Sequence, residues 1–248
     1  MIKSIIKHEL GLTIYNRKTW YCIAAIQSLL AVIFNWLLTN FLKHKMVFDS
    51  VRYGVTEEII HPYYAWFALI VLAFIPMLTT QSICAEKNRH TILNYYCAPV
   101  TSLQVILGKF FALNLMLALI TISISILPLA IILSGSLDWG HYFASILGVY
   151  LMLSASLALG LVFSSFMGSI ARTNIVIFFS LLFFILLEWA AQFTGKPAMF
   201  LQNFGLLNPL KSLLSGIISV QHVAYYLLII IACLMLSAEL FKGKRQYA

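Results

Sequence analysis

Charged residues are scarce in this chain. Only 10% of its 248 residues are Asp, Glu, Lys or Arg, whereas 62% are hydrophobic, and the mean hydropathy is +0.94. Soluble globular domains carry roughly 25% charged residues. This composition excludes an ordinary soluble enzyme or binding domain and predicts a protein that crosses a membrane several times.

Common sequence motifs for nucleotide binding, catalysis and metal binding are also absent. No GxxxxGK[ST] sequence occurs, because Gly108-Lys109 is followed by Phe110 and Gly195-Lys196 lacks the earlier glycine. The chain has no GxSxG or HExxH sequence, and no CxxC spacing occurs among Cys22, Cys84, Cys97 and Cys233. We therefore predict no catalytic residue, no metal site, no disulfide framework and no cofactor bound by this chain.

The hydrophobic residues gather in runs that are long enough to cross a bilayer, which takes about 20 residues. We predict an all-α membrane protein with six transmembrane helices, over residues 20–42, 63–84, 103–133, 142–167, 174–193 and 222–241. Residues 1–18 carry isoleucines and a leucine at helical spacing and predict an amphipathic interfacial helix. Residues 195–221 are apolar but broken by Pro and Gly, and predict an external re-entrant segment.

The distribution of Lys and Arg predicts the orientation. With the N-terminus inside, eleven of the sixteen Lys and Arg residues lie in inner segments and five in outer ones. Inner loops of membrane proteins carry such an excess, so both termini and residues 85–101 are predicted to be cytoplasmic. Because the basic residues stand at the ends of apolar runs rather than in one patch, the net charge of +8 does not indicate a nucleic-acid partner.

Residues 85–101, AEKNRHTILNYYCAPVT, separate the second and third predicted spans. Their apolar residues can gather on one side of a short surface helix that Pro99 ends, because proline lacks the N–H that a helix interior needs. Thr101 and Gln104 then predict a capping box at the start of the third span. The alternative is a solvated loop with no docking function.

This segment resembles the first cytoplasmic loop of ABC-2-type transporter permeases, especially the gliding-motility-associated subgroup. The resemblance rests on Glu86, Lys87, Arg89, Thr91, Leu93, Pro99, Val100, Gly108, Lys109 and Phe110. His90 and Asn94 stand where that family usually has Gly and an acidic residue. It implies that residues 85–101 are a coupling helix on a partner ATPase, with coupling residues Glu86, Lys87, Arg89, Thr91, Leu93, Tyr96 and Pro99.

The same resemblance implies a permease subunit, most often of an exporter, in the bacterial inner membrane. Two permeases would work with two ATPase subunits, which would carry the ATP and Mg; a related permease and a periplasmic or membrane accessory protein are further candidate partners. Two other functions stay open. One is an ion-coupled secondary transporter or channel, and the other is a membrane scaffold of an envelope machine that transports nothing.

Two polar features lie inside the predicted spans. Glu188 is a candidate pathway or gating residue, because a carboxylate in a span is costly unless it is paired or faces water. The alternative is that it lies near the outer end and bonds a neighbouring helix. A row of small residues predicts a helix-packing seam in the fourth span, at Ser156, Gly160, Ser164 and Gly168.

Overall fold

The structure, a computed structural model, describes residues 2–15, 17–47, 56–88, 101–130, 138–193 and 205–246. Its elements are α1 (Ile2–Ile14), α2 (Arg17–Val47), a π-helical turn η1 (Thr56–Ile60), α3 (His61–Ser82), α4 (Cys84–Asn88), α6 (Ser102–Leu129), α7 (Trp139–Phe166), α8 (Ile170–Phe193), α10 (Leu207–Leu214) and α11 (Val220–Gln246). No strand occurs among the residues in these ranges.

Six helical segments are long and apolar enough to cross a membrane. They are Thr19–Lys43, Glu58–Ser82, Ser102–Leu129, Trp139–Phe166, Ile170–Ala190 and Val220–Lys242. The prediction of an all-α protein with six spans is confirmed at this level. The fifth span was predicted to begin at residue 174, but α8 already begins at Ile170; the exposed Arg172 therefore lies in its first turn, where a long side chain can reach the interface.

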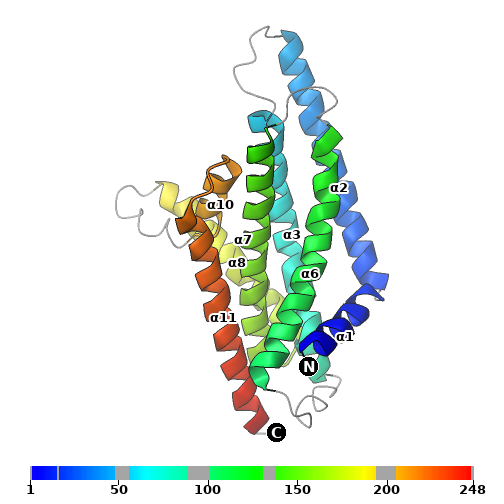
Figure 1. Cartoon of the computed structure of the whole chain (residues 1–248), viewed down its shortest axis with the longest axis vertical. Helices are drawn as coiled ribbons and strands as arrows, with labels where there is room; N and C mark the ends of the chain where they lie inside the picture. The colour runs from blue at the N-terminus through cyan, green and yellow to red at the C-terminus, as the bar shows by residue number, and fades with distance from the viewer. Residues whose placement is uncertain are drawn as a thin grey trace.

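The long helices stand side by side in an elongated bundle, and α1 lies across one end of it (Figure 1). We call this end, where α4, the start of α6 and the ends of α7 and α11 also lie, the α1 end. The short helix α10 lies toward the opposite end, which we call the α10 end (Figure 1). Of the predicted re-entrant segment, residues 205–221 fall within the described part of the chain and include α10.

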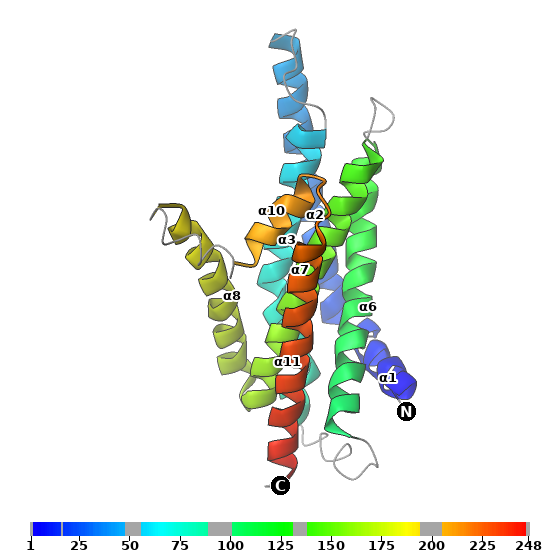
Figure 2. The ribbon, with the colours of Figure 1, turned by 60° about the vertical axis from the view of Figure 1, so that its left-hand side comes forward.

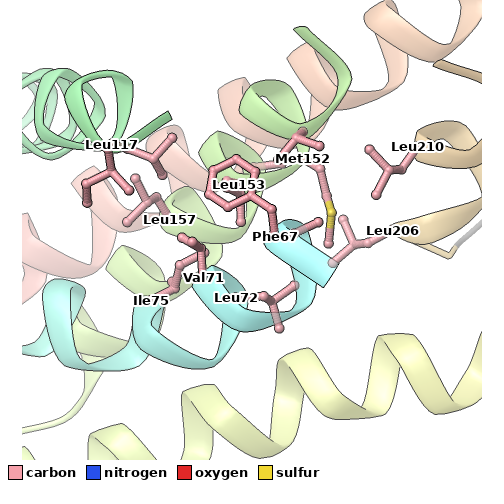
Figure 3. Close-up of a cluster of buried hydrophobic side chains, with 14 of the residues drawn as sticks. Phe67, Val71, Leu72, Ile75, Leu117, Met152, Leu153, Leu157, Leu206 and Leu210 are labelled. Carbon is pink, nitrogen blue, oxygen red and sulfur yellow. The ribbon is translucent and has the colours of Figure 1, made fainter. Parts of the chain in front are cut away.

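α7 is the most buried of the six candidate spans, and it packs against α3, α6, α8, α10 and α11. Figure 3 shows side chains of α3 and α7 gathered between the two helices, with Phe67 and Val71 of α3 near Leu153 and Leu157 of α7. All four side chains are buried. Lipid tails are as apolar as these residues, so the contact stabilises the bundle through van der Waals packing rather than through removal from water.

The outer helices are far less buried than α7. Within the most apolar stretch of each helix, 22% of α2, 17% of α8 and 28% of α11 is buried, against 61% of α7. α8 also diverges from the bundle toward the α10 end (Figure 2). Large side chains such as Phe179, Phe183 and Trp189 are therefore exposed on α8, as expected of a face that meets lipid or another subunit.

α6 begins at the capping box that the sequence predicts. The Thr101 hydroxyl accepts a hydrogen bond from the Gln104 backbone N–H at 3.3 Å, and the Gln104 side chain accepts one from the Thr101 N–H at 3.2 Å. This prediction is confirmed. The box satisfies two of the free amides at the helix start and so fixes the start of α6 at Ser102.

The small residues of the predicted packing seam differ in burial and in what they contact. Ser156, Gly160 and Ser164 are buried in α7, whereas Gly168 lies beyond the end of the helix at Phe166. A Cβ atom on Gly160 would lie 2.7 Å from the Thr79 side chain of α3, but a Cβ atom on Gly168 would meet nothing within 4 Å. Gly160 therefore lets α3 and α7 approach closely, and Gly168 has no such contact.

Replacing Gly160 by Ala should push α3 and α7 apart and lower the stability of the bundle by about 1–3 kcal/mol, the usual effect of overpacking a tight interface. Gly168→Ala is the matched control and should leave stability unchanged. Unfolding of the two purified variants in detergent, followed by intrinsic fluorescence, compares them. Equal stabilities would contradict the assigned contact.

Candidate functional site

The predicted coupling segment is described only at its two ends. The structure describes the segment up to residue 88, in α4, and again from Thr101, whereas residues 89–100 lie outside the described residues. Five of the predicted coupling residues fall in that range: Arg89, Thr91, Leu93, Tyr96 and Pro99. The surface on which the segment stands is described, and we call it the loop base; it consists of α1, α4, the first two turns of α6 and the end of α7.

Lys109 is the centre of the loop base. Its ammonium group donates hydrogen bonds to the Glu9 carboxylate of α1, to the Glu86 carboxylate of α4 at 2.8 Å, and to the Ser82 carbonyl at the end of α3 at 2.8 Å. An ammonium has three N–H donors, so each of these three helices takes one. One side chain of α6 thus joins α1, α3 and α4.

All three charged groups of this cluster are withdrawn from solvent. The Lys109 side chain is 0% exposed, Glu9 7% and Glu86 14%. An unpaired charge at such depth would be strongly unfavourable, so each group depends on the others for its presence there. Beside the cluster, α1 and α6 touch: a Cβ atom on Gly108 would lie 2.7 Å from Ile5. The small residue permits the approach that the ion pair requires.

Lys87 joins the loop base to α7. Its ammonium donates to the Ser164 carbonyl at 3.1 Å, to the Met167 carbonyl at 3.4 Å and to the Ser165 carbonyl. These carbonyls end α7 without partners in their own helix, and a cation at a helix C-terminus is favoured by the helix dipole. The backbone N–H of Cys84 adds a hydrogen bond to the Ser164 hydroxyl at 3.2 Å. α4 is therefore attached to α7 as well as to α6.

Burial raises the pKa of the Glu86 carboxyl to about 7, although the Lys109 ammonium lowers it; the nearby Glu9 contributes to the rise. Glu86 lies in α4, outside the candidate spans. Burial disfavours the charged form because the carboxylate loses its hydration. The cluster therefore has a group that exchanges a proton near neutral pH.

Glu86 and Lys87 were both predicted to contact an ATPase, and the structure shows each bonded within the chain. Their role in coupling stays a prediction. The sequence analysis named Lys109, which is fully buried in α6, only for the resemblance and did not name Glu9, so it did not predict this cluster. The sequence did contain a signal that Glu9 needs a positively charged partner, since Glu9 is the single acidic residue before Asp49 in an otherwise basic segment.

Glu188 lies toward the α10 end, far along the bundle from the loop base. Its carboxylate pairs with Lys211 of α10 at 2.8 Å and accepts a hydrogen bond from the Leu207 backbone N–H at 2.9 Å. Glu188 is 2% exposed, and Lys211 half exposed. The carboxylate thus holds the N-terminus of α10 to α8; a pathway or gating role stays a prediction.

The described residues contain no group of three or more His, Cys, Asp or Glu side chains that could hold a metal ion. A small apolar cavity lies between α2, α3 and α6, lined among others by Cys22, Ile26, Met77 and Ile120. Its lining offers almost no polar surface with which to orient a ligand. The loop base is therefore the site with the most specific polar geometry in the described part of the chain.

These features define a multi-pass helical membrane protein with buried ion pairs at both the α1 end and the α10 end of the bundle. Comparison with protein families gives a match to "ABC-2 family transporter protein" over residues 22–241. The chain belongs to this family and is thus a membrane component of an ABC transporter. Membership implies an ABC ATPase partner in general. No curated protein matches the chain.

Replacing Lys109 by Met should lower stability by about 3–5 kcal/mol at neutral pH, because it leaves two carboxyl groups buried without their cation. The triple variant Lys109→Met, Glu9→Gln, Glu86→Gln should recover most of this loss, since no charge is then stranded. Lys242→Met, at an exposed position of α11, is the control for losing a positive charge. Thermal unfolding in detergent measures all three. A single variant as stable as the parent would refute the role given to Lys109.

Proposed function

We propose that this chain is the permease subunit of an ABC exporter, and that a separate ATPase subunit binds residues 85–101 together with α1. The observation that supports this most directly is the loop base. Glu86 and Lys87 stand at the start of the segment, and both are bonded to helices of the bundle. A force applied to the segment is therefore transmitted to α3, α6 and α7 through these bonds.

The proposed mechanism follows from these attachments. ATP-driven closure of the two ATPase subunits pushes on the segment and tilts α3 and α6, which enter and leave it. α1 moves with them because Glu9 is paired with Lys109. Rigid-body tilting of packed helices is a common way to alternate access to a pathway, here one that forms between two permease subunits.

The proposed assembly has two permeases, identical or related, and two ATPase subunits that hold ATP and Mg. It sits in the bacterial inner membrane with the α1 end in the cytoplasm, in keeping with the excess of Lys and Arg in those segments. The resemblance of residues 86–110 favours the gliding-motility-associated subgroup and export. An accessory protein at the outer face is a further proposed partner.

An ion-coupled secondary transporter or channel is the main alternative. Such proteins carry ionisable groups that line a pathway in the spans. Here Lys109 and Glu188, both buried, are bonded to groups that hold helices together. This observation favours structural roles for them and therefore the ABC permease. A non-transporting scaffold is distinguished by whether ATP drives movement of any substrate.

Isolation of the tagged chain from its native membrane should recover an ABC ATPase in a ratio near one to one. Replacing Arg89 and Leu93 together by Ala should uncouple ATP hydrolysis from transport, because both residues are proposed to contact the ATPase. The readouts are the copurified subunits and, after reconstitution, transport per ATP. An unchanged ratio of transport to hydrolysis in the double variant would count against the proposed docking surface.

Replacing Lys87 by Met should weaken the connection between α4 and the end of α7. We expect ATP hydrolysis by the complex to continue while transport per ATP falls several-fold, since the motion reaches α7 less completely. Lys87→Arg should restore much of the coupling, because the guanidinium can still donate to the same carbonyls. Lys242→Met controls for the lost charge. Full coupling in Lys87→Met would argue against transmission through α7.

A further inference from the structure

Near the α10 end, a proline interrupts the hydrogen bonding of α6. Pro128 lies inside this helix, one residue before it ends at Leu129. Because proline has no backbone N–H, the Ile124 carbonyl, four residues earlier, lacks the donor that a regular helix would give it. Ile124 is 0% exposed. A buried carbonyl without a donor is unfavourable, so this turn of α6 needs a donor from another helix.

Two tyrosines in the first turn of α3 bond to this turn of α6. The Tyr63 hydroxyl donates to the Ile124 carbonyl at 3.1 Å and so supplies the donor that Pro128 lacks. The Tyr64 hydroxyl donates to the Ser125 hydroxyl, also at 3.1 Å. Both tyrosine side chains are fully buried. α3 is therefore joined to two adjacent residues of α6.

A third tyrosine brings α7 to the same place. The Tyr142 hydroxyl, in the first turn of α7, donates to the Ser125 carbonyl at 2.6 Å. Its ring meets the Tyr64 ring edge to face with 6.2 Å between centroids, and Tyr63 and Tyr64 meet in the same way at 5.5 Å. Such edge-to-face pairs are favourable. We call Tyr63, Tyr64 and Tyr142, with Ile124 and Ser125, the tyrosine cluster.

The tyrosine cluster and the loop base join the same helices at opposite ends. At the α1 end, Lys109 of α6 donates to the Ser82 carbonyl of α3, and Lys87 donates to carbonyls at the end of α7. At the α10 end, the tyrosine hydroxyls of α3 and α7 donate to α6. Between the two ends, buried apolar side chains of α3 and α7 pack together (Figure 3). α3, α6 and α7 are thus held together along their length.

We propose that the tyrosine cluster holds the α10 ends of α3, α6 and α7 together, so that a tilt applied at the loop base carries all three helices as one body to the opposite face. Tyr63, Tyr64 and Tyr142 are then positioning residues, which act through the helices that they join. The cluster itself does not depend on transport. Its effect on motion rests on the proposed function, because only there does an ATPase push on the α1 end.

A double-mutant cycle on the purified permease, without ATPase, tests the bond at Pro128. Tyr63→Phe should raise the unfolding equilibrium constant about tenfold, because the buried Ile124 carbonyl loses its donor. In a Pro128→Ala background the same substitution should cost much less, since position 128 then has a backbone N–H for that carbonyl. Tyr21→Phe, at a 73% exposed position of α2, is the control and should change nothing. Equal costs of Tyr63→Phe in both backgrounds would overturn the assigned bond.

Distance measurements in the complex with the ATPase test the motion. Spin labels replace Trp66 of α3 and Ile126 of α6, both exposed near the cluster, through noncanonical residues. Adding the ATP analogue adenylyl imidodiphosphate should leave their separation unchanged in the parent.

The nucleotide should change or broaden that separation in the variant Tyr63→Phe, Tyr64→Phe. It should still do so when Pro128→Ala is added, because the added N–H returns stability to α6 without joining it to α3. A nucleotide-dependent separation in the parent, an unchanged one in the two-tyrosine variant, or recovery of the parent behaviour by Pro128→Ala would overturn the proposal. Failure to isolate an ATPase would instead contradict the proposed function, and the cycle at Pro128 would stand apart from it.

Discussion

The burial of the Lys109 ammonium is the constraint on which the α1 end of the molecule depends. A lysine with 0% exposure must have its charge and all three of its donors satisfied by protein. Glu9, Glu86 and the Ser82 carbonyl meet that need from three different helices. Lys109 therefore joins α1, the end of α3 and α4 at one point.

The bundle divides into a well-packed centre and an exposed periphery. α7 packs against α3, α6, α8, α10 and α11, and close contacts at Gly148 and Gly160 bring α10 and α3 against it. α2, α8 and α11 leave most of their apolar surface outside. In a family whose members are membrane components of larger assemblies, such a centre can move as a unit while the outer faces meet lipid or neighbouring subunits.

Ion pairs at the two ends of the bundle are built differently. At the α1 end two carboxyl groups share one fully buried ammonium, which also donates to the Ser82 carbonyl, so the contact joins three helices to α6. At the α10 end Glu188 meets one half-exposed lysine and the backbone N–H of Leu207 at the start of α10, so the contact joins α8 to α10.

The sequence by itself determined the all-α class, the six apolar helices and the capping of α6 by Thr101. These features depend on composition, on the length of apolar runs and on capping bonds between residues that are close in the sequence. Only the tertiary structure decided that Glu9 meets Lys109 across a hundred positions, that Glu86 and Lys87 face inward, and that Gly160 has a neighbour while Gly168 has none. Periodicity tells which side of a helix is apolar, but the partner of each polar side chain depends on how helices distant in sequence pack together.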